Sequence, residues 1–120
     1  MSKKYYSNDH ILFVLENDQT ILVYLADYLS KQINPDFFQF TSAGERIGAY
    51  SPIGVIESKK FSFEITAPFD CTILAINEAL FSEKPKACCQ LPWLVKISPH
   101  SENWKDELMD EETYGAYVSP

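Results

Sequence analysis

The sequence predicts one mainly β domain, a sandwich or barrel with short helices added. The chain has 120 residues, a length that suits a single domain spanning residues 1–120. Short apolar runs alternate with turn-forming residues along most of the chain, and no repeat of solenoid period is visible. Many short strands, one internal helix and a helical tail favour a mainly β architecture.

The first half of the chain predicts a hairpin followed by a helix. Ile11–Leu15 and Thr20–Leu25 are rich in Ile, Val, Leu and Tyr around a four-residue polar break, which is typical of a β-hairpin. Apolar residues at helical spacing from Ala26 to Ile33 predict a short amphipathic helix. Asn34-Pro35-Asp36 ends it.

A second hairpin is predicted near the middle of the chain. Phe37–Phe40 is a brief strand, and Thr41–Pro52 has the Gly and Pro content of a loop. Ile53–Ile56 is apolar, and Phe61–Ile65 alternates apolar and polar residues as a half-buried strand does. Glu57–Lys60 connects the two strands.

Two further strands and a helical tail complete the predicted domain. The strands are Thr72–Ile76 and Trp93–Ile97, and the tail covers about residues 101–118. Ser101 and Asp110 are each suited to cap the start of a helix.

The charge excludes nucleic acid as an expected partner. The net charge is −7, acidic residues are dense in the last third, and Lys59-Lys60 is too small a basic cluster to count as a stripe. Phosphate binding requires a basic stripe, whereas an acidic surface attracts a protein with a basic patch.

We find no apolar signal core or membrane-spanning segment. We therefore expect a soluble protein, cytoplasmic in a bacterium, or in the mitochondrial matrix if a transit peptide has been removed.

Neither a metal site nor a catalytic constellation is expected. The three cysteines, Cys71 and the adjacent Cys88-Cys89, do not form a disulfide framework and suggest a reducing compartment. His10 and His100 do not lie at ligand spacing from the cysteines. His10 is interpreted as a packed or hydrogen-bonded histidine and Cys71 as a small buried hydrophobe. The chain is therefore predicted not to be an enzyme.

Lys59-Lys60 stands where the central hairpin should turn. Tight hairpins prefer Gly-containing pairs because the favoured turns need positive φ, and a broken local rule points to function. Surface turns also accept lysine freely, so this feature alone fits an ordinary exposed turn better. Likewise, Glu57 by itself fits a solvated strand residue, and Gly44 fits a turn that needs positive φ.

The spacing around Lys60 resembles that around the lipoylated lysine of glycine cleavage H proteins. The family pattern there is Gly, a long spacer, Gly-Val-Val-Glu-Ser-Val-Lys and then Ala-Pro. The matching residues are Gly44, Gly54-Val55, Glu57-Ser58, Lys60 and Ala67-Pro68. Three further blocks match in order, namely Tyr6–His10, Trp93–Ile97 and Leu108–Tyr114. Departures from the pattern, which leave the scaffold and the lysine intact, lie at Ile11, Leu12, Lys59, Asp70-Cys71 and Cys88–Pro92.

This resemblance implies a fold and a modification site. The fold is the lipoyl/biotinyl-type barrel-sandwich hybrid, with a short internal helix, C-terminal helices and a lipoyl hairpin at about residues 53–66. Lipoate would be attached covalently to Lys60. Glu57 and Gly44 would help the lipoate ligase or lipoyl transferase to recognise the tip.

The resemblance also implies a function and partners. The chain would be a monomeric, non-catalytic carrier that shuttles an aminomethyl group and reducing equivalents between partner enzymes. These are glycine decarboxylase (P protein), aminomethyltransferase (T protein) and dihydrolipoyl dehydrogenase (L protein). The alternatives are a divergent H-like protein in lipoyl relay or redox signalling, and an unmodified protein-interaction module.

Overall fold

The computed structural model describes residues 3–17, 19–30, 37–60, 62–81 and 93–118. In chain order the elements are β1 (Lys3–Tyr6), β2 (Ile11–Asn17), β3 (Thr20–Leu25), α1 (Asp27–Ser30), β4 (Phe37–Phe40), β5 (Arg46–Ile47), β6 (Pro52–Glu57), β7 (Ser62–Thr66), β8 (Cys71–Ile76), the 3₁₀ helix η1 (Glu78–Phe81), β9 (Val95–Pro99), β10 (Met109–Asp110) and α2 (Glu111–Val118).

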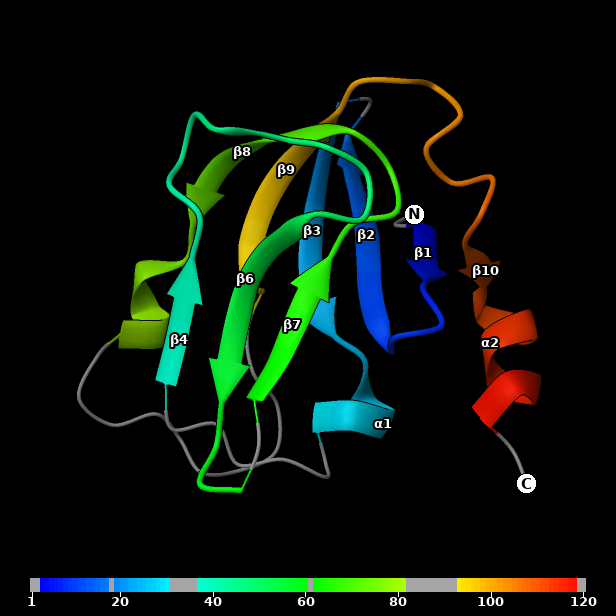
Figure 1. The fold of residues 1–120 in the computed structure, drawn as a ribbon. Helices are drawn as coiled ribbons and strands as arrows, with labels where there is room; N and C mark the ends of the chain where they lie inside the picture. The colour runs from blue at the N-terminus through cyan, green and yellow to red at the C-terminus, as the bar shows by residue number, and fades with distance from the viewer. Residues whose placement is uncertain (1–2, 18, 31–36, 61, 82–92, 119–120) are drawn as a thin grey trace.

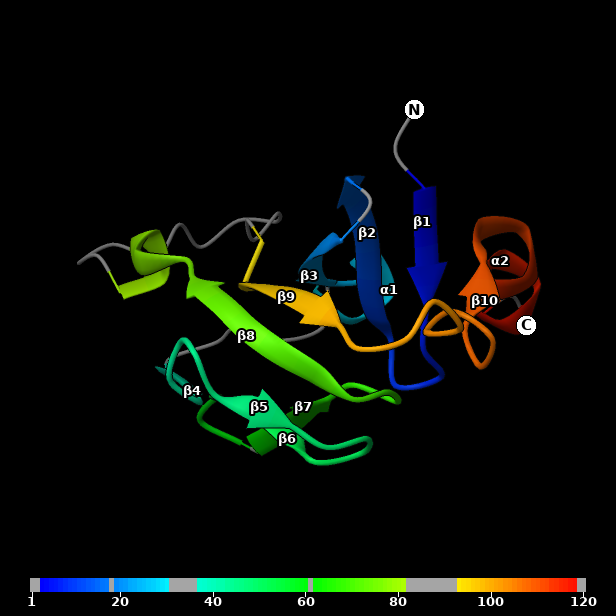
Figure 2. The ribbon, with the colours of Figure 1, turned by 90° about the horizontal axis from the view of Figure 1, so that it is seen from above.

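The strands form two antiparallel sheets (Figure 1). One sheet has seven strands in the order β10-β1-β2-β3-β9-β8-β5, and the other has three in the order β4-β6-β7. Seen from above, the three-stranded sheet lies across one side of the larger sheet, so the two make a layered arrangement (Figure 2). The predicted mainly β architecture is confirmed.

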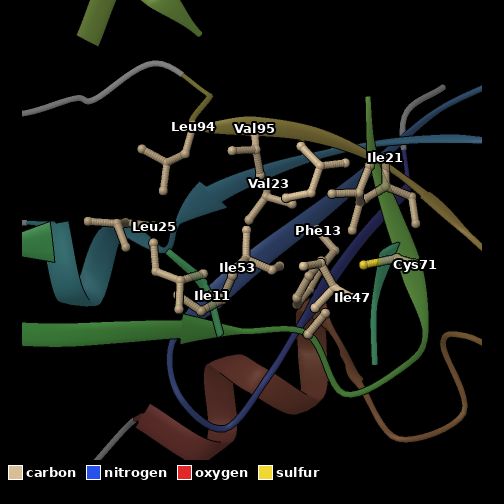
Figure 3. Packing of buried hydrophobic residues seen from close by; sticks show 14 of the residues in the cluster. Ile11, Phe13, Ile21, Val23, Leu25, Ile47, Ile53, Cys71, Leu94 and Val95 are labelled. Carbon is tan, nitrogen blue, oxygen red and sulfur yellow. The ribbon is translucent and has the colours of Figure 1, made fainter. Parts of the chain in front are cut away.

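The core lies between the sheets because each contributes one apolar face. Ile11 and Phe13 alternate with half-buried residues along β2, and both are fully buried. From the smaller sheet, Ile53 and Ile65 are also fully buried and belong to the same cluster, part of which is drawn in Figure 3. Burying one such side chain stabilises the fold by about 1.5–3 kcal/mol, so the cluster holds the three-stranded sheet against the larger one.

Several predicted elements are confirmed with small shifts. The first hairpin is β2–β3, the brief strand is β4, and the central hairpin is β6–β7. The predicted loop over residues 41–52 contains the short strand β5, and the strand predicted at residues 93–97 runs from Val95 to Pro99. The internal helix is described only from Asp27 to Ser30, and the rest of its predicted length lies outside the described residues.

The helix predicted to start at Ser101 is wrong. The Ser101 hydroxyl does accept a hydrogen bond from the backbone N–H of Asn103 at 3.0 Å, but turns follow in place of a helix. Trp104 explains the difference, because its ring is only 7% exposed and packs edge-on against Phe69 and Tyr5. Bringing that ring into the core bends the chain. The described tail therefore contains one helix, α2, where two were expected.

Besides β5, three short elements were not predicted: β1, β10 and η1. Strands β1 and β10 pair with each other, with Tyr5 opposite Asp110, although they lie at opposite ends of the chain. Such pairing has no local sequence signal. Asn77 caps the start of η1, since its Oδ1 accepts a hydrogen bond from the Ala79 N–H at 3.1 Å. In the described part of the chain, no helix is long and apolar enough to cross a membrane.

Candidate functional site

The candidate site is the end of the β6–β7 hairpin. The two strands pair with Val55 opposite Glu64 and with Glu57 opposite Ser62, so residues 58–61 connect them. Ile56 and Ile65 are buried on the core side, whereas Glu57 and Ser62 are exposed. One face of the hairpin is therefore anchored in the core while its end projects towards solvent (Figure 1).

Lys59 and Lys60 lie in the bend at this end, and both side chains are exposed. The Lys60 N–H lies 3.4 Å from the Ser58 hydroxyl oxygen, which accepts a long hydrogen bond from it. Among the described residues the ion pair within 4.0 Å joins Lys96 and Glu16, so neither tip lysine is held by a described carboxylate. An exposed primary amine that forms no ion pair with a described residue, at the end of a core-anchored hairpin, is suited to acylation by another protein.

Glu57 is the last residue of β6 and is exposed. It lies three residues before Lys60, and its neighbours across the sheet are Ser62 on β7 and Phe37 on β4. The structure therefore brings Glu57 and Lys60 to the same end of the hairpin, as the sequence predicts. A protein that contacts Lys60 has Glu57 within its reach.

Gly44 lies at the other end of the sheet. Strand β4 runs antiparallel to β6, with Phe40 opposite Gly54, and beyond that end the chain continues from β4 to β5 (Figure 1). Gly44 belongs to this connection between β4 and β5. The φ of Gly44 is +92°, and its N–H donates to the Ile73 carbonyl oxygen at 2.7 Å. A Cβ at this position would meet no atom within 4 Å, so the backbone conformation, not space, requires glycine here. The structure does not bring Gly44 beside Lys60.

Gly54 has a structural role that the motif alone did not explain. A Cβ on Gly54 would lie 2.3 Å from Phe40 Cδ1 and 2.7 Å from the Gln39 carbonyl oxygen. Only glycine therefore allows β4 to pack this closely on β6. A glycine inside a strand pattern is the signal for such a close approach.

The sequence also matches a known protein family. The model of the family described as "Glycine cleavage H-protein" matches residues 4–120. The chain belongs to the glycine cleavage H-protein family. A glycine cleavage system H protein from Paraburkholderia phymatum is 31% identical over 94% of this chain and 92% of its own. One from Bartonella tribocorum is 28% identical over 98% of this chain and 99% of its own.

A solved structure shows the same fold. The crystal structure of a glycine cleavage system H protein from Mycobacterium marinum superposes with a TM-score of 0.75, at 20% sequence identity, over 96% of this chain and 95% of that one. The predicted barrel-sandwich fold is thereby confirmed. H proteins are lipoyl-bearing carrier components of the glycine cleavage system and are not themselves catalytic.

The opening block of this H protein, Tyr6–His10, packs against α2. We call this region, made of β1, β10 and α2 with His10, the C-terminal corner. His10 has φ 68°, and its Nδ1 lies 2.7 Å from the Tyr114 hydroxyl. The rings of Tyr6 and Tyr114 stack with centroids 4.1 Å apart. Burial, followed by neighbouring tyrosines, raises the pKa of Tyr114 to about 12, so its hydroxyl stays protonated at neutral pH. His10 is thus a hydrogen-bonded packing residue, as predicted.

The remaining candidate groups of this H protein contribute no reactive site that the structure describes. Cys71 is fully buried, and its pKa is raised to about 11 by burial and by the charge of Asp70, so its thiol is inert at neutral pH. Among the described residues, no group of three or more His, Cys, Asp or Glu could hold a metal ion. Cys88-Cys89 lies outside the described residues.

Proposed function

We propose that this H protein carries lipoate in amide linkage on Lys60 and shuttles an aminomethyl group and reducing equivalents between the enzymes of glycine cleavage. The observation that supports this most directly is the exposure of Lys60 at the end of a core-anchored hairpin in a family of lipoyl carriers. An amide bond to the Lys60 Nζ would remove one positive charge and leave a long arm ending in a dithiolane.

The fold suits a tethered carrier because the hairpin is anchored in the core and its end is exposed. The hairpin is held by the buried residues Ile53, Ile56 and Ile65, so the position of Lys60 is set by the core. A tethered group reaches several client sites at high effective concentration without dissociating. The proposed clients are glycine decarboxylase, aminomethyltransferase and dihydrolipoyl dehydrogenase, and the net charge of −7 favours clients with basic faces.

We also propose that a lipoate ligase or lipoyl transferase recognises the tip through Glu57. Its carboxylate is exposed beside the lysine and is free of ion pairs with other described residues. Gly44 would act at a distance in this recognition, through the loop whose conformation it allows.

The experiment that tests the modification site uses the full chain, a lipoate ligase, lipoate and ATP. Intact mass should rise by one lipoyl group, and peptide mapping should place it on Lys60. The Lys60→Arg variant should gain no label, whereas the matched variant Lys59→Arg should be labelled like the parent. Label on Lys59 alone, or on neither lysine, would contradict the proposal and favour an unmodified interaction module.

A second measurement tests the carrier role. The lipoylated protein should be reduced by dihydrolipoyl dehydrogenase with NADH, and the rate should fall as salt rises, since exposed charges are screened. Reduction combined with a lack of turnover by glycine decarboxylase and aminomethyltransferase would favour lipoyl relay or redox signalling. A lipoylated protein that is not reduced would count against any carrier role.

A further inference from the structure

Phe37 is an exposed phenyl ring beside the candidate site. Its side chain is 50% exposed, although the next residue, Phe38, is only 6% exposed and packs in the core. Phe37 is the first residue of β4, one of the two edge strands of the three-stranded sheet. Single exposed apolar residues are common, so its position, not its exposure alone, makes it informative.

The strand register places Phe37 at the lysine end of that sheet. Phe37 lies directly opposite Glu57, and Glu57 lies directly opposite Ser62. Side chains of directly opposed residues point to the same face, with Cβ atoms about 4.5–5.5 Å apart. All three side chains are exposed, which shows that they are on the outer face. They form a row across the sheet.

The row has an apolar end and an acidic centre. Phe37 is diagonal to Val55, a half-buried residue two positions before Glu57 on β6. Diagonal neighbours lie close enough for an aromatic ring to reach. A partner surface that complements this row therefore has an apolar recess for the Phe37 ring and, beside it, a basic residue for the Glu57 carboxylate.

The enzyme that acylates Lys60 is the partner that this surface fits. That enzyme must bring its reacting carbon to the Lys60 Nζ, and a standard interface covers about 800 Å² on each partner. Residues opposite Glu57, three positions from the lysine, lie within such a footprint. Client enzymes instead act at the far end of the lipoyl arm, so they do not require contact with the sheet next to the tip.

We propose that Phe37 is a recognition residue for the lipoate-attaching enzyme and forms one surface with Glu57. This inference rests on the proposed acylation of Lys60. It adds Phe37 to the site. Phe37 lies 23 positions before Lys60 in the sequence, and the strand register alone brings it to the lysine end of the sheet.

The test measures initial rates of lipoylation against the concentration of unmodified protein, with a lipoate ligase, lipoate and ATP. Phe37→Thr removes the ring but keeps a β-branched residue suited to a strand. We expect KM for the protein to rise on the order of tenfold, as for an aromatic anchor, with kcat unchanged. Phe37→Tyr keeps the ring and should behave like the parent.

Leu74→Thr is the matched control because Leu74 is 43% exposed on β8 of the other sheet. Its KM should stay within twofold of the parent value. Once lipoylated, Phe37→Thr should be reduced by dihydrolipoyl dehydrogenase as fast as the parent. Circular dichroism should show that every variant is folded.

The outcomes separate this inference from the proposed function. A parent that gains no label at Lys60 overturns both. A labelled parent combined with an unchanged KM for Phe37→Thr overturns the role of Phe37 alone. Equal rises in KM for Phe37→Thr and Leu74→Thr would also overturn it, because the effect would then not be local to the tip.

Discussion

The lysine hairpin and the C-terminal corner of this H protein are built in opposite ways. In the hairpin, β6 and β7 are neighbours in the sequence, and Glu57 pairs with Ser62 only five positions later. In the corner, β1 pairs with β10 from the other end of the chain, with Tyr5 opposite Asp110, and α2 follows directly (Figure 1). A local sequence motif therefore describes the hairpin, whereas long-range contacts make the corner.

Together with the proposed function, the difference predicts that stability and modification depend on separate regions of this protein. The end of the hairpin has exposed charged side chains with few described partners, as the proposed modification requires. The corner has stacked rings and a hydrogen bond between His10 and Tyr114. Substitutions in the corner should change stability with little effect on modification, and those at the hairpin end should do the reverse.

The largest effect on stability is expected from Tyr114→Ala. Tyr114 is 6% exposed, stacks on Tyr6 and contacts His10, so its removal leaves a cavity and an unpaired ring nitrogen. The free energy of unfolding, measured by urea denaturation, should fall by about 3 kcal/mol. Tyr117→Ala, a change at a 52% exposed ring, should cost well under about 1 kcal/mol. A slower lipoylation of folded Tyr114→Ala would contradict the separation of the two regions.

Gly54→Ala should also destabilise the protein, by about 1–3 kcal/mol, because the added methyl group overlaps the Phe40 ring and the Gln39 carbonyl oxygen. Gly115→Ala is the matched control in α2, where a Cβ meets no atom within 4 Å. That change should raise stability by about 0.5–1 kcal/mol, since alanine favours the helix. Thermal unfolding of both variants measures the change in Tm relative to the parent. Changes in Tm of the same sign for the two variants would show that the close approach of β4 and β6 is unimportant.

Asp110 should make a pH-dependent contribution to the corner. Its Oδ1 accepts a hydrogen bond from the Thr113 N–H at 2.8 Å at the start of α2, and this bond lowers the pKa of Asp110. Because the unfolded carboxyl group binds a proton at higher pH than the folded one, the stabilisation is present above the ordinary pKa of aspartate. It is lost as the pH falls through the lower folded value. The difference in unfolding free energy between the parent and Asp110→Ala should therefore shrink in acid, and a constant difference would refute this.

The smallest effect on stability is expected from Glu57→Ala, because the side chain is exposed at the end of β6. Stability should change by less than about half a kcal/mol, while the rate of lipoylation should fall. Glu102→Ala, at an exposed carboxylate in the turns after β9, should lipoylate like the parent. Equal rates for Glu57→Ala and the parent would count against a recognition role for Glu57.

Periodicity predicted most of the strands of the core, and the reason is local. Alternation over residues 62–65 and the apolar run at residues 53–56 each reflect one buried face, so a single strand is enough to show it. The connection at residues 57–60 was predictable for the same reason, since it joins two strands that are neighbours in the sequence. The tail was predicted less well because the burial of Trp104, and not the capping residue Ser101, decides its path.

By itself, then, the sequence determined the mainly β class, the central hairpin, and the juxtaposition of Glu57 and Lys60, since each depends on residues a few positions apart. The tertiary structure alone decided that Gly44 lies at the end of the sheet away from Lys60 and that Phe37 lies beside Glu57. It also decided that the two ends of the chain pair as β1 and β10. These arrangements follow from the register of antiparallel strands and from burial of a shared core, and both depend on the whole chain at once.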